Sequence, residues 1–105
     1  MRLAIEPDMV ILGETGNGAT AIDLVPVLKP DVVVMDIEMP GMDGITAART
    51  IRSIAPRTAV VVLTVYDNSG NRREATVAGV VAFVGKHEAV EALPAAIRQA
   101  ARFIL

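Results

Sequence analysis

Three side chains that suit phosphoryl chemistry stand at or just beyond the ends of short apolar runs: Asp36, Thr64 and Lys86. A carboxylate can act as a nucleophile or a metal ligand. A hydroxyl can donate a hydrogen bond to a phosphoryl oxygen, and an ammonium can offset the charge of an anionic group. We therefore expect a site for an incoming phosphoryl group, in which Asp36 attacks, Thr64 donates and Lys86 neutralises.

Strands and helices alternate in the predicted organisation of the chain. Four apolar runs have the length and the β-branched composition of buried strands: Met9–Leu12, Val32–Met35, Ala59–Leu63 and Val80–Val84. Amphipathic stripes between and after them predict helices over Ala19–Leu28 and Ile45–Ile54, a weaker one around Ala75, and a last one over about Val90–Phe103. This alternation favours right-handed crossovers and a parallel sheet covered on both faces. The carboxyl ends of such strands meet at one edge, which would bring Asp36, Thr64 and Lys86 together.

Polar residues, glycine and proline mark the ends of these helices. The candidate N-caps are Asn17, Asp43 and one of Asp67, Asn68 or Ser69, and Gly79 is a candidate C-cap. Pro26 lies late in its helix and should kink or shorten it. Pro94 should fall in about the first turn of the last helix, where its missing N–H costs little.

Composition narrows the class of protein. The 105 residues are 52% hydrophobic and 21% charged, which is typical of one globular domain. The net charge of −2, without a long run of one sign, argues against binding to nucleic acid or to a membrane surface. Cysteine is absent, which excludes disulfides and thiolate chemistry and is consistent with a cytoplasmic protein.

The chain resembles the receiver domain of two-component response regulators over essentially its whole length. The resemblance rests on Asp36 followed by Met39-Pro40-Gly41-Met42-Asp43-Gly44, on the strand that ends in Leu63-Thr64, and on Phe83-Val84-Gly85-Lys86. It implies a flavodoxin-like (CheY-like), doubly wound α/β fold. It also implies a phosphoprotein without enzymatic activity of its own, in which Asp36 takes a phosphoryl group from a histidine kinase and Thr64 and Phe83 switch a partner surface. The segment Gly13–Gly18 resembles receivers that usually precede a helix-turn-helix output domain.

The chain also departs from the family's pattern. In the family a central first strand ends in two acidic residues that hold Mg²⁺, whereas Met1–Ile5 resembles the end of the helix that follows that strand. We therefore expect residues 1–105 to form a receiver domain that is incomplete at its N-terminus, without the first strand and most of the first helix. Mg²⁺ binding should be weak, through Asp36 and the backbone carbonyl of Glu38, with the side chain of Glu38 or of Glu14 as partial compensation.

Two smaller departures lie next to the expected site residues. Val65 follows Thr64 where relatives commonly have a small residue, and it should narrow access to the phosphoryl pocket. His87 follows Lys86 where many relatives have proline. The loop conformation that directs Lys86 toward the site therefore cannot be set by a proline here.

Two alternatives belong to other functional classes. One is a pseudo-receiver that takes no phosphate and pairs with a partner, or with a second copy, through its last helix and the edge at Val80–Val84. The other is a phosphatase of the haloacid-dehalogenase type, which also uses a strand-end aspartate. Those enzymes usually carry a second aspartate two residues on, where this chain has Glu38.

Overall fold

The computed structural model describes residues 9, 12, 13, 15–39 and 41–101. Its elements follow the order α1 (Gly18–Leu28), β1 (Val32–Met35), α2 (Gly44–Ile54), β2 (Ala59–Thr64), α3 (Ser69–Val77), β3 (Ala82–Gly85), a short 3₁₀ helix η1 (Lys86–Glu88) and α4 (Ala89–Ala101). Strands and helices alternate along the chain, as the hydrophobic pattern predicts. No helix in the described part of the chain is long and apolar enough to cross a membrane.

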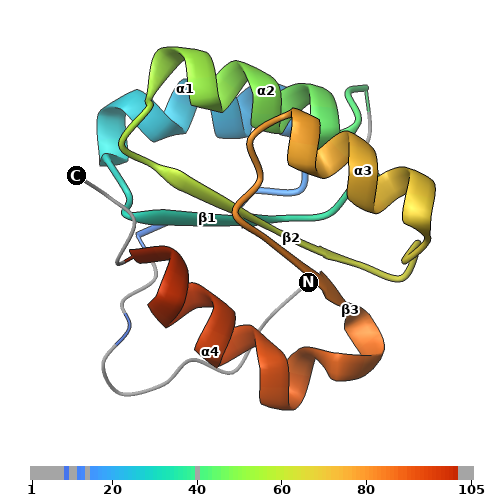
Figure 1. Cartoon of the computed structure of the whole chain (residues 1–105). Helices are drawn as coiled ribbons and strands as arrows, with labels where there is room; N and C mark the ends of the chain where they lie inside the picture. The colour runs from blue at the N-terminus through green and yellow to red at the C-terminus, as the bar shows by residue number, and fades with distance from the viewer. Residues whose placement is uncertain (1–8, 10–11, 14, 40, 102–105) are drawn as a thin grey trace.

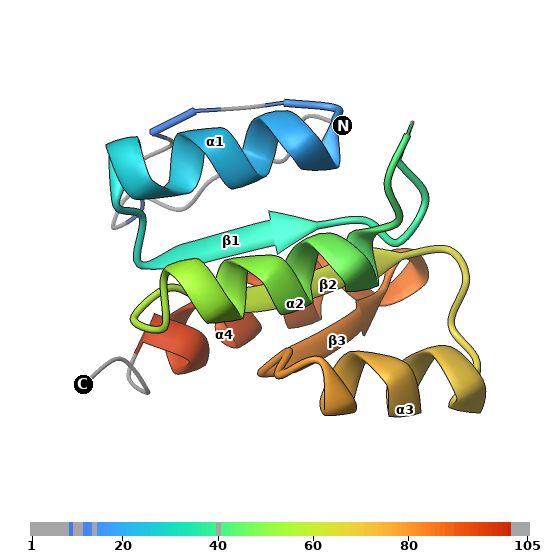
Figure 2. The same ribbon diagram turned by 90° about the horizontal axis from the view of Figure 1, so that it is seen from above.

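The three described strands form one parallel sheet in the order β1-β2-β3 (Figures 1 and 2). Met35 pairs with Val62, and Thr64 pairs with Gly85. The strands therefore end at the same edge of the sheet. This register places Asp36, Thr64 and Lys86 at that edge, because each residue ends its strand or directly follows it.

Helices cover both faces of the sheet. Helices α1, α2 and α3 lie on one face, with α3 next to α2, and α4 lies on the other (Figures 1 and 2). Each covered face has its own apolar cluster. The cluster under α1 and α2 contains Ala21, Val25, Met35, Ala47, Ala48, Ile51 and Val60, and the cluster under α4 contains Ala59, Val61, Leu63, Val84, Leu93 and Ala100. Alternate residues of β2 thus enter opposite clusters, as the two-residue period of a strand requires.

The helix ends follow the predicted caps. The side chain of Asn17 accepts hydrogen bonds from the N–H groups of Ala19 and Thr20, and Asp43 caps α2 in the same way. Of the three candidates before α3, Asn68 is the cap. Gly79, with a φ of 90°, follows the end of α3 and donates its N–H to the carbonyl of Thr76.

Helix α1 ends at Leu28, the residue that the sequence pattern predicts, so Pro26 does not shorten it. Two other expectations were wrong. Helix α4 begins at Ala89, which places Pro94 beyond its first turn. Strand β3 begins at Ala82 rather than Val80, because the N–H of Val80 still closes the end of α3 on the carbonyl of Ala75.

The expected first strand and the end of the last helix fall partly outside the described residues. Met9 and Leu12 lie in no strand, and residues 10 and 11 are outside the described part of the chain. Residues 102–105, which include the expected end at Phe103, are outside it as well.

Candidate functional site

Asp36 and Lys86 meet at the carboxyl edge of the sheet. The Nζ of Lys86 lies 2.9 Å from Oδ2 of Asp36, and the two side chains are 30% and 25% exposed. The other carboxylate oxygen, Oδ1, accepts a hydrogen bond from the backbone N–H of Glu38 at 3.2 Å. The carboxylate is therefore held from both sides but remains open to solvent, as an attacking group must be.

The turn after Asp36 is closed by backbone contacts. The N–H of Gly44 donates to the carbonyl of Ile37 at 2.8 Å, and a Cβ at Gly44 would overlap the carbonyl oxygen of Asp36. Asp43 accepts from the N–H of Thr46 at 2.9 Å and from its hydroxyl at 2.8 Å. Helix α2 therefore begins directly against the backbone of Asp36, which fixes where the carboxylate leaves the sheet.

The surroundings of Asp36 favour its ionised form. Partial burial raises the pKa of the carboxyl group, but hydrogen bonds from Lys86, from the N–H of Glu38 and from Thr64, together with the charge of Lys86, lower it by more. The net result is a pKa below the ordinary value. The group is thus a carboxylate at neutral pH, the form that a nucleophile requires.

Thr64 is a fully buried residue at the end of β2. Its hydroxyl accepts a hydrogen bond from the N–H of Tyr66 at 3.1 Å, and it faces Asp36 closely enough to lower that residue's pKa. The hydroxyl proton can point at Asp36 or at an oxygen brought to it, because the bond from Tyr66 uses the hydroxyl only as an acceptor. The structure thus brings Asp36, Thr64 and Lys86 together, as the register of the strand ends predicts.

Phe83, the expected switch residue, is partly buried in β3. The guanidinium of Arg72 lies over its ring, 4.8 Å from the centroid. A shallow groove between α3 and β3 is lined by Arg72, Ala75, Thr76, Phe83 and residues 80–82. The ring is therefore covered by a charged side chain from α3 rather than by core residues alone.

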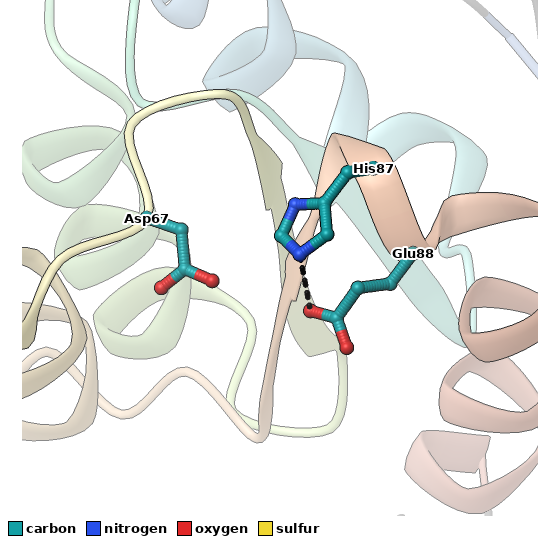
Figure 3. Close-up of side chains that lie close together, drawn as sticks. All are labelled: Asp67, His87 and Glu88. Carbon is teal, nitrogen blue, oxygen red and sulfur yellow. Dashed lines mark ion pairs between the residues drawn. The ribbon is translucent and has the colours of Figure 1, made fainter.

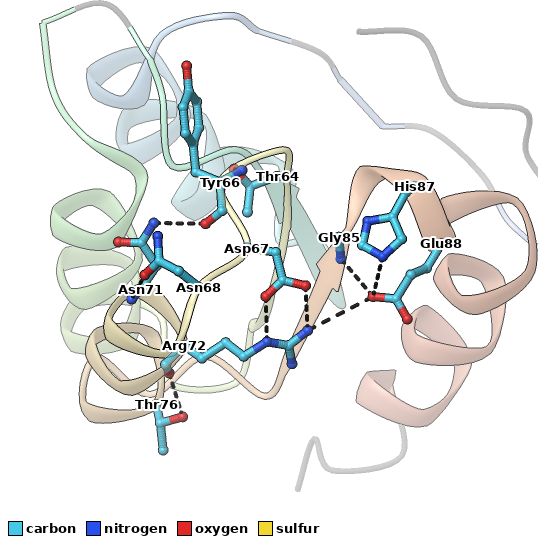
Figure 4. Close-up of polar contacts among 10 residues, drawn as sticks. All are labelled: Thr64, Tyr66, Asp67, Asn68, Asn71, Arg72, Thr76, Gly85, His87 and Glu88. Atoms are coloured by element: carbon cyan, nitrogen blue, oxygen red, sulfur yellow. Dashed lines mark hydrogen bonds and ion pairs between the residues drawn. The ribbon is translucent and has the colours of Figure 1, made fainter.

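A second polar cluster lies beside the site and joins the loops that follow β2 and β3 (Figures 3 and 4). Arg72 pairs with both oxygens of Asp67, at 2.6 and 2.8 Å, and lies 3.9 Å from Glu88. Glu88 also accepts the N–H of Gly85 at 3.2 Å, and the His87 ring lies 4.0 Å from it. Sequence patterns did not predict this cluster, because its members come from α3 and from two loops that only the fold brings together.

The two carboxylates, Asp67 and Glu88, and His87 are close enough to hold a metal ion. Arg72, however, already occupies both oxygens of Asp67 and lowers its pKa. A cation would have to displace that guanidinium. We therefore interpret the cluster as a network of ion pairs.

Ligands for Mg²⁺ at Asp36 are few in the described residues. The donors that the sequence predicts there are the carboxylate of Asp36 and the backbone carbonyl and side chain of Glu38, which is exposed, and residue 14 lies outside the described residues. Mg²⁺ takes six oxygens, commonly keeps several waters and needs only one or two carboxylates. The donor set thus fits a site in which water supplies most of the ligands.

Comparison with known proteins gives one consistent result. Residues 1–98 match the model of the response regulator receiver domain. The chain is 42% identical over 97 residues to the uncharacterised transcriptional regulatory protein YxjL of Bacillus subtilis, covering 92% of this chain and 44% of that protein. It is 40% identical to a protein-glutamate methylesterase/protein-glutamine glutaminase of Methanosarcina mazei, over 82% of this chain and 24% of the enzyme.

Solved structures agree with this result. The response regulator domain of Thermotoga maritima CheB superimposes with a TM-score of 0.84 at 32% identity, covering 92% of this chain and 80% of that one. The chain spans less than half the length of the two curated relatives, YxjL and the methylesterase. What it shares with each of them is therefore a part of the longer protein.

Proposed function

Because the chain belongs to the receiver domains of two-component response regulators, we propose that Asp36 accepts the phosphoryl group from the phosphohistidine of a histidine kinase. An oxygen of Asp36 forms the new bond to phosphorus while the phosphorus–nitrogen bond breaks, and the imidazole nitrogen keeps the bonding pair. The product is an aspartyl phosphate. The receiver itself has no further chemistry in this scheme, and any enzymatic activity belongs to other domains, as the methylesterase relative illustrates.

The observation that carries the proposal is the contact of Asp36 with the single nitrogen of the Lys86 ammonium. That nitrogen lies 2.9 Å from Oδ2, while Oδ1 accepts the N–H of Glu38. It can therefore move to an oxygen of the arriving phosphoryl group without leaving the site, and offset the charge there. Thr64 is fully buried, and its hydroxyl, which already faces Asp36, would donate to a second phosphoryl oxygen.

Mg²⁺ would be held by Asp36 and the backbone carbonyl of Glu38, with water completing its shell. When bound, it would offset further negative charge on the phosphoryl oxygens. The small number of protein ligands supports weak binding. We therefore expect phosphorylation of this chain to be slow and to depend on a high Mg²⁺ concentration.

The phosphoryl group would act on the rest of the molecule through Thr64 and Phe83. A hydroxyl drawn toward the phosphoryl group would release its bond to the N–H of Tyr66 and so change the loop after β2. Phe83 lies on the neighbouring strand, beneath α3. The surface around α3 and β3 is then the expected binding surface for an output partner or a second copy. The signalling pathway would be cytoplasmic.

Labelling by a small phosphodonor tests the proposal. Incubation with radiolabelled acetyl phosphate and Mg²⁺ should label the wild-type chain and Asp31→Asn, but not Asp36→Asn. Asp31→Asn is the matched control, because it removes an exposed carboxylate at the opposite end of the same strand, β1. Equal labelling of Asp36→Asn and wild type would contradict the proposal.

Nothing in the comparisons favours the two alternatives from other classes. Three measurements on the same purified chain distinguish these alternatives: labelling, dimerisation and hydrolysis of a phosphate ester. A pseudo-receiver would remain unlabelled and would dimerise equally well without a phosphodonor. A phosphatase of the haloacid-dehalogenase type would turn over a generic phosphate ester.

A further inference from the structure

Lys86 lies in a short loop that is fixed at several points. The 3₁₀ helix η1 begins at Lys86 and ends at Glu88, whose carboxylate turns back to accept the N–H of Gly85. The His87 ring folds over Gly85, since a Cβ built there would come within 2.6 Å of its Cε1. The residues on both sides of Lys86 are thus held by contacts, although histidine rather than proline follows the lysine.

Arg72 connects this loop to the one that follows Thr64. Its guanidinium donates to both oxygens of Asp67, three residues after Thr64, and lies 3.9 Å from the Glu88 oxygen that holds Gly85 (Figure 4). It also covers the ring of Phe83. One side chain from α3 therefore contacts the loop after β2, strand β3 and the loop after β3.

Both loops also approach each other directly at Gly85. An added Cβ at that glycine would lie 3.1 Å from Oδ2 of Asp67. Gly85 is buried and pairs with Thr64 in the register of the sheet. A change in the position of Asp67 would therefore act on Gly85, the residue directly before Lys86.

From these contacts we propose that Arg72 and Glu88 are positioning residues that set where the Lys86 ammonium stands relative to Asp36. Arg72 fixes Glu88 and Asp67 against each other, Glu88 fixes Gly85, and Gly85 fixes the start of the loop that aims Lys86. A planar guanidinium suits this task, because it binds a carboxylate at two points and stacks on an aromatic ring at the same time. The inference deepens the proposed function, since it explains how one of its groups is aimed.

The first experiment asks whether Arg72 acts through Lys86. Rates of labelling by acetyl phosphate are compared for wild type, Arg72→Gln, Lys86→Ala and the double variant, with Arg73→Gln as the control. Arg73 is the next residue of α3, is exposed and carries the same charge. Arg72→Gln should slow labelling roughly three- to tenfold, Arg73→Gln should not, and in the Lys86→Ala background Arg72→Gln should have no further effect. Independent, multiplying effects of the two substitutions would overturn the proposal.

The second experiment needs no phosphorylation. The titration of Asp36 is followed by NMR of its carboxyl carbon, and Arg72→Gln should raise the pKa of Asp36 toward the value found in Lys86→Ala, whereas Arg73→Gln should leave it unchanged. An Asp36 titration identical in Arg72→Gln and Arg73→Gln would show that Arg72 supports only the fold, and would overturn the inference. A shifted titration in a chain that no donor labels would leave the positioning role standing and refute the proposed function instead.

Glu88 offers a graded test of the same path. Glu88→Gln keeps an oxygen that can accept the N–H of Gly85 but loses the charge that faces Arg72, whereas Glu88→Ala loses both. We expect the pKa of Asp36 to rise more in Glu88→Ala than in Glu88→Gln. Equal, wild-type titrations in both variants would contradict a role for Glu88.

Discussion

Asp36 and Asp67 are two aspartates at the same edge of the sheet, but one carboxylate is available to a reactant and the other is taken up by an ion pair. Each follows a strand, each pairs with a cation and each has a lowered pKa. Asp36 meets the single nitrogen of a lysine at Oδ2, whereas Asp67 meets two nitrogens of an arginine, one at each oxygen. A one-point pair can open toward a reactant. A two-point pair uses both oxygens of the carboxylate, which then serves only to hold the structure.

The two regions also differ in what holds them. The turn after Asp36 is closed by backbone contacts, with Gly44 packed against the carbonyl of Asp36. The loop around Asp67 is held by side chains, chiefly Arg72 and Asn71, whose amide donates to the carbonyl of Tyr66 at 2.8 Å. Because backbone contacts hold the turn after Asp36, its carboxylate remains available for chemistry. The carboxylate of Asp67 is itself one of the groups that hold its loop, so it is not available.

The largest expected effect comes from adding one methyl group to each region. Gly44→Ala forces a Cβ into the carbonyl of Asp36, where backbone cannot yield, and should cost about 3 kcal/mol or more of the free energy of unfolding. Gly70→Ala in α3 meets only an ordinary contact with Asn68 at 3.4 Å and should be neutral or slightly stabilising. Urea denaturation followed by circular dichroism measures both. A mild effect at Gly44 would remove the contrast between the two regions.

Replacing Lys86 by arginine should give Asp36 the kind of ion pair that Asp67 has. In Lys86→Arg the charge is kept, but the guanidinium can bind both carboxylate oxygens and hold them. Labelling by acetyl phosphate should therefore fall about 10²-fold, although the fold remains intact. Arg72→Lys is the reciprocal variant, and it should slow labelling by no more than the roughly three- to tenfold expected for Arg72→Gln. Wild-type labelling of Lys86→Arg would mean that the number of contacts does not matter.

A third aspartate separates capping from chemistry. Asp43 lies beside the Asp36 turn, but its pKa is lowered by the N–H and hydroxyl of Thr46, which is the pattern of a helix cap. Asp43→Ala should cost about 1 kcal/mol of unfolding free energy. Its labelling per folded molecule should equal that of wild type, and a loss as large as that of Asp36→Asn would assign Asp43 to the site instead.

The smallest expected effect is on the pH dependence of stability. The pKa of Asp36 is lower in the folded than in the unfolded chain, so its ionised form stabilises the fold above the unfolded value of about 3.9, and this contribution is lost as the pH falls through the folded value. The free energy of unfolding of Asp36→Asn should therefore fall less steeply than that of wild type as the solution is acidified. Denaturation curves recorded at several acidic pH values measure the difference. A steeper fall for the variant would reverse the sign inferred from the contacts of Asp36.

Local patterns in the sequence predicted much of this arrangement. The β-branched runs marked β1 and β2, and Asn17 and Asp43 marked the starts of α1 and α2. The three reactive residues were predictable because parallel strands end at one edge, so that chain position alone brings Asp36, Thr64 and Lys86 together. Proline positions were predicted less well. A local rule expects Pro26 to kink or shorten α1, but the helix, which packs against α2, runs on to Leu28.

The sequence by itself determined which residues stand at the reactive edge, because that depends on the period of the strands and on the turn chemistry after each one. Only the tertiary structure decided which carboxylate stays open. Asp36 and Lys86 lie fifty residues apart, and Arg72 reaches Glu88 across a sheet edge, so these pairs depend on how loops meet in space. Aspartate paired with a cation is the same pattern in both regions of the sequence. The number of oxygens that the cation touches is a matter of geometry.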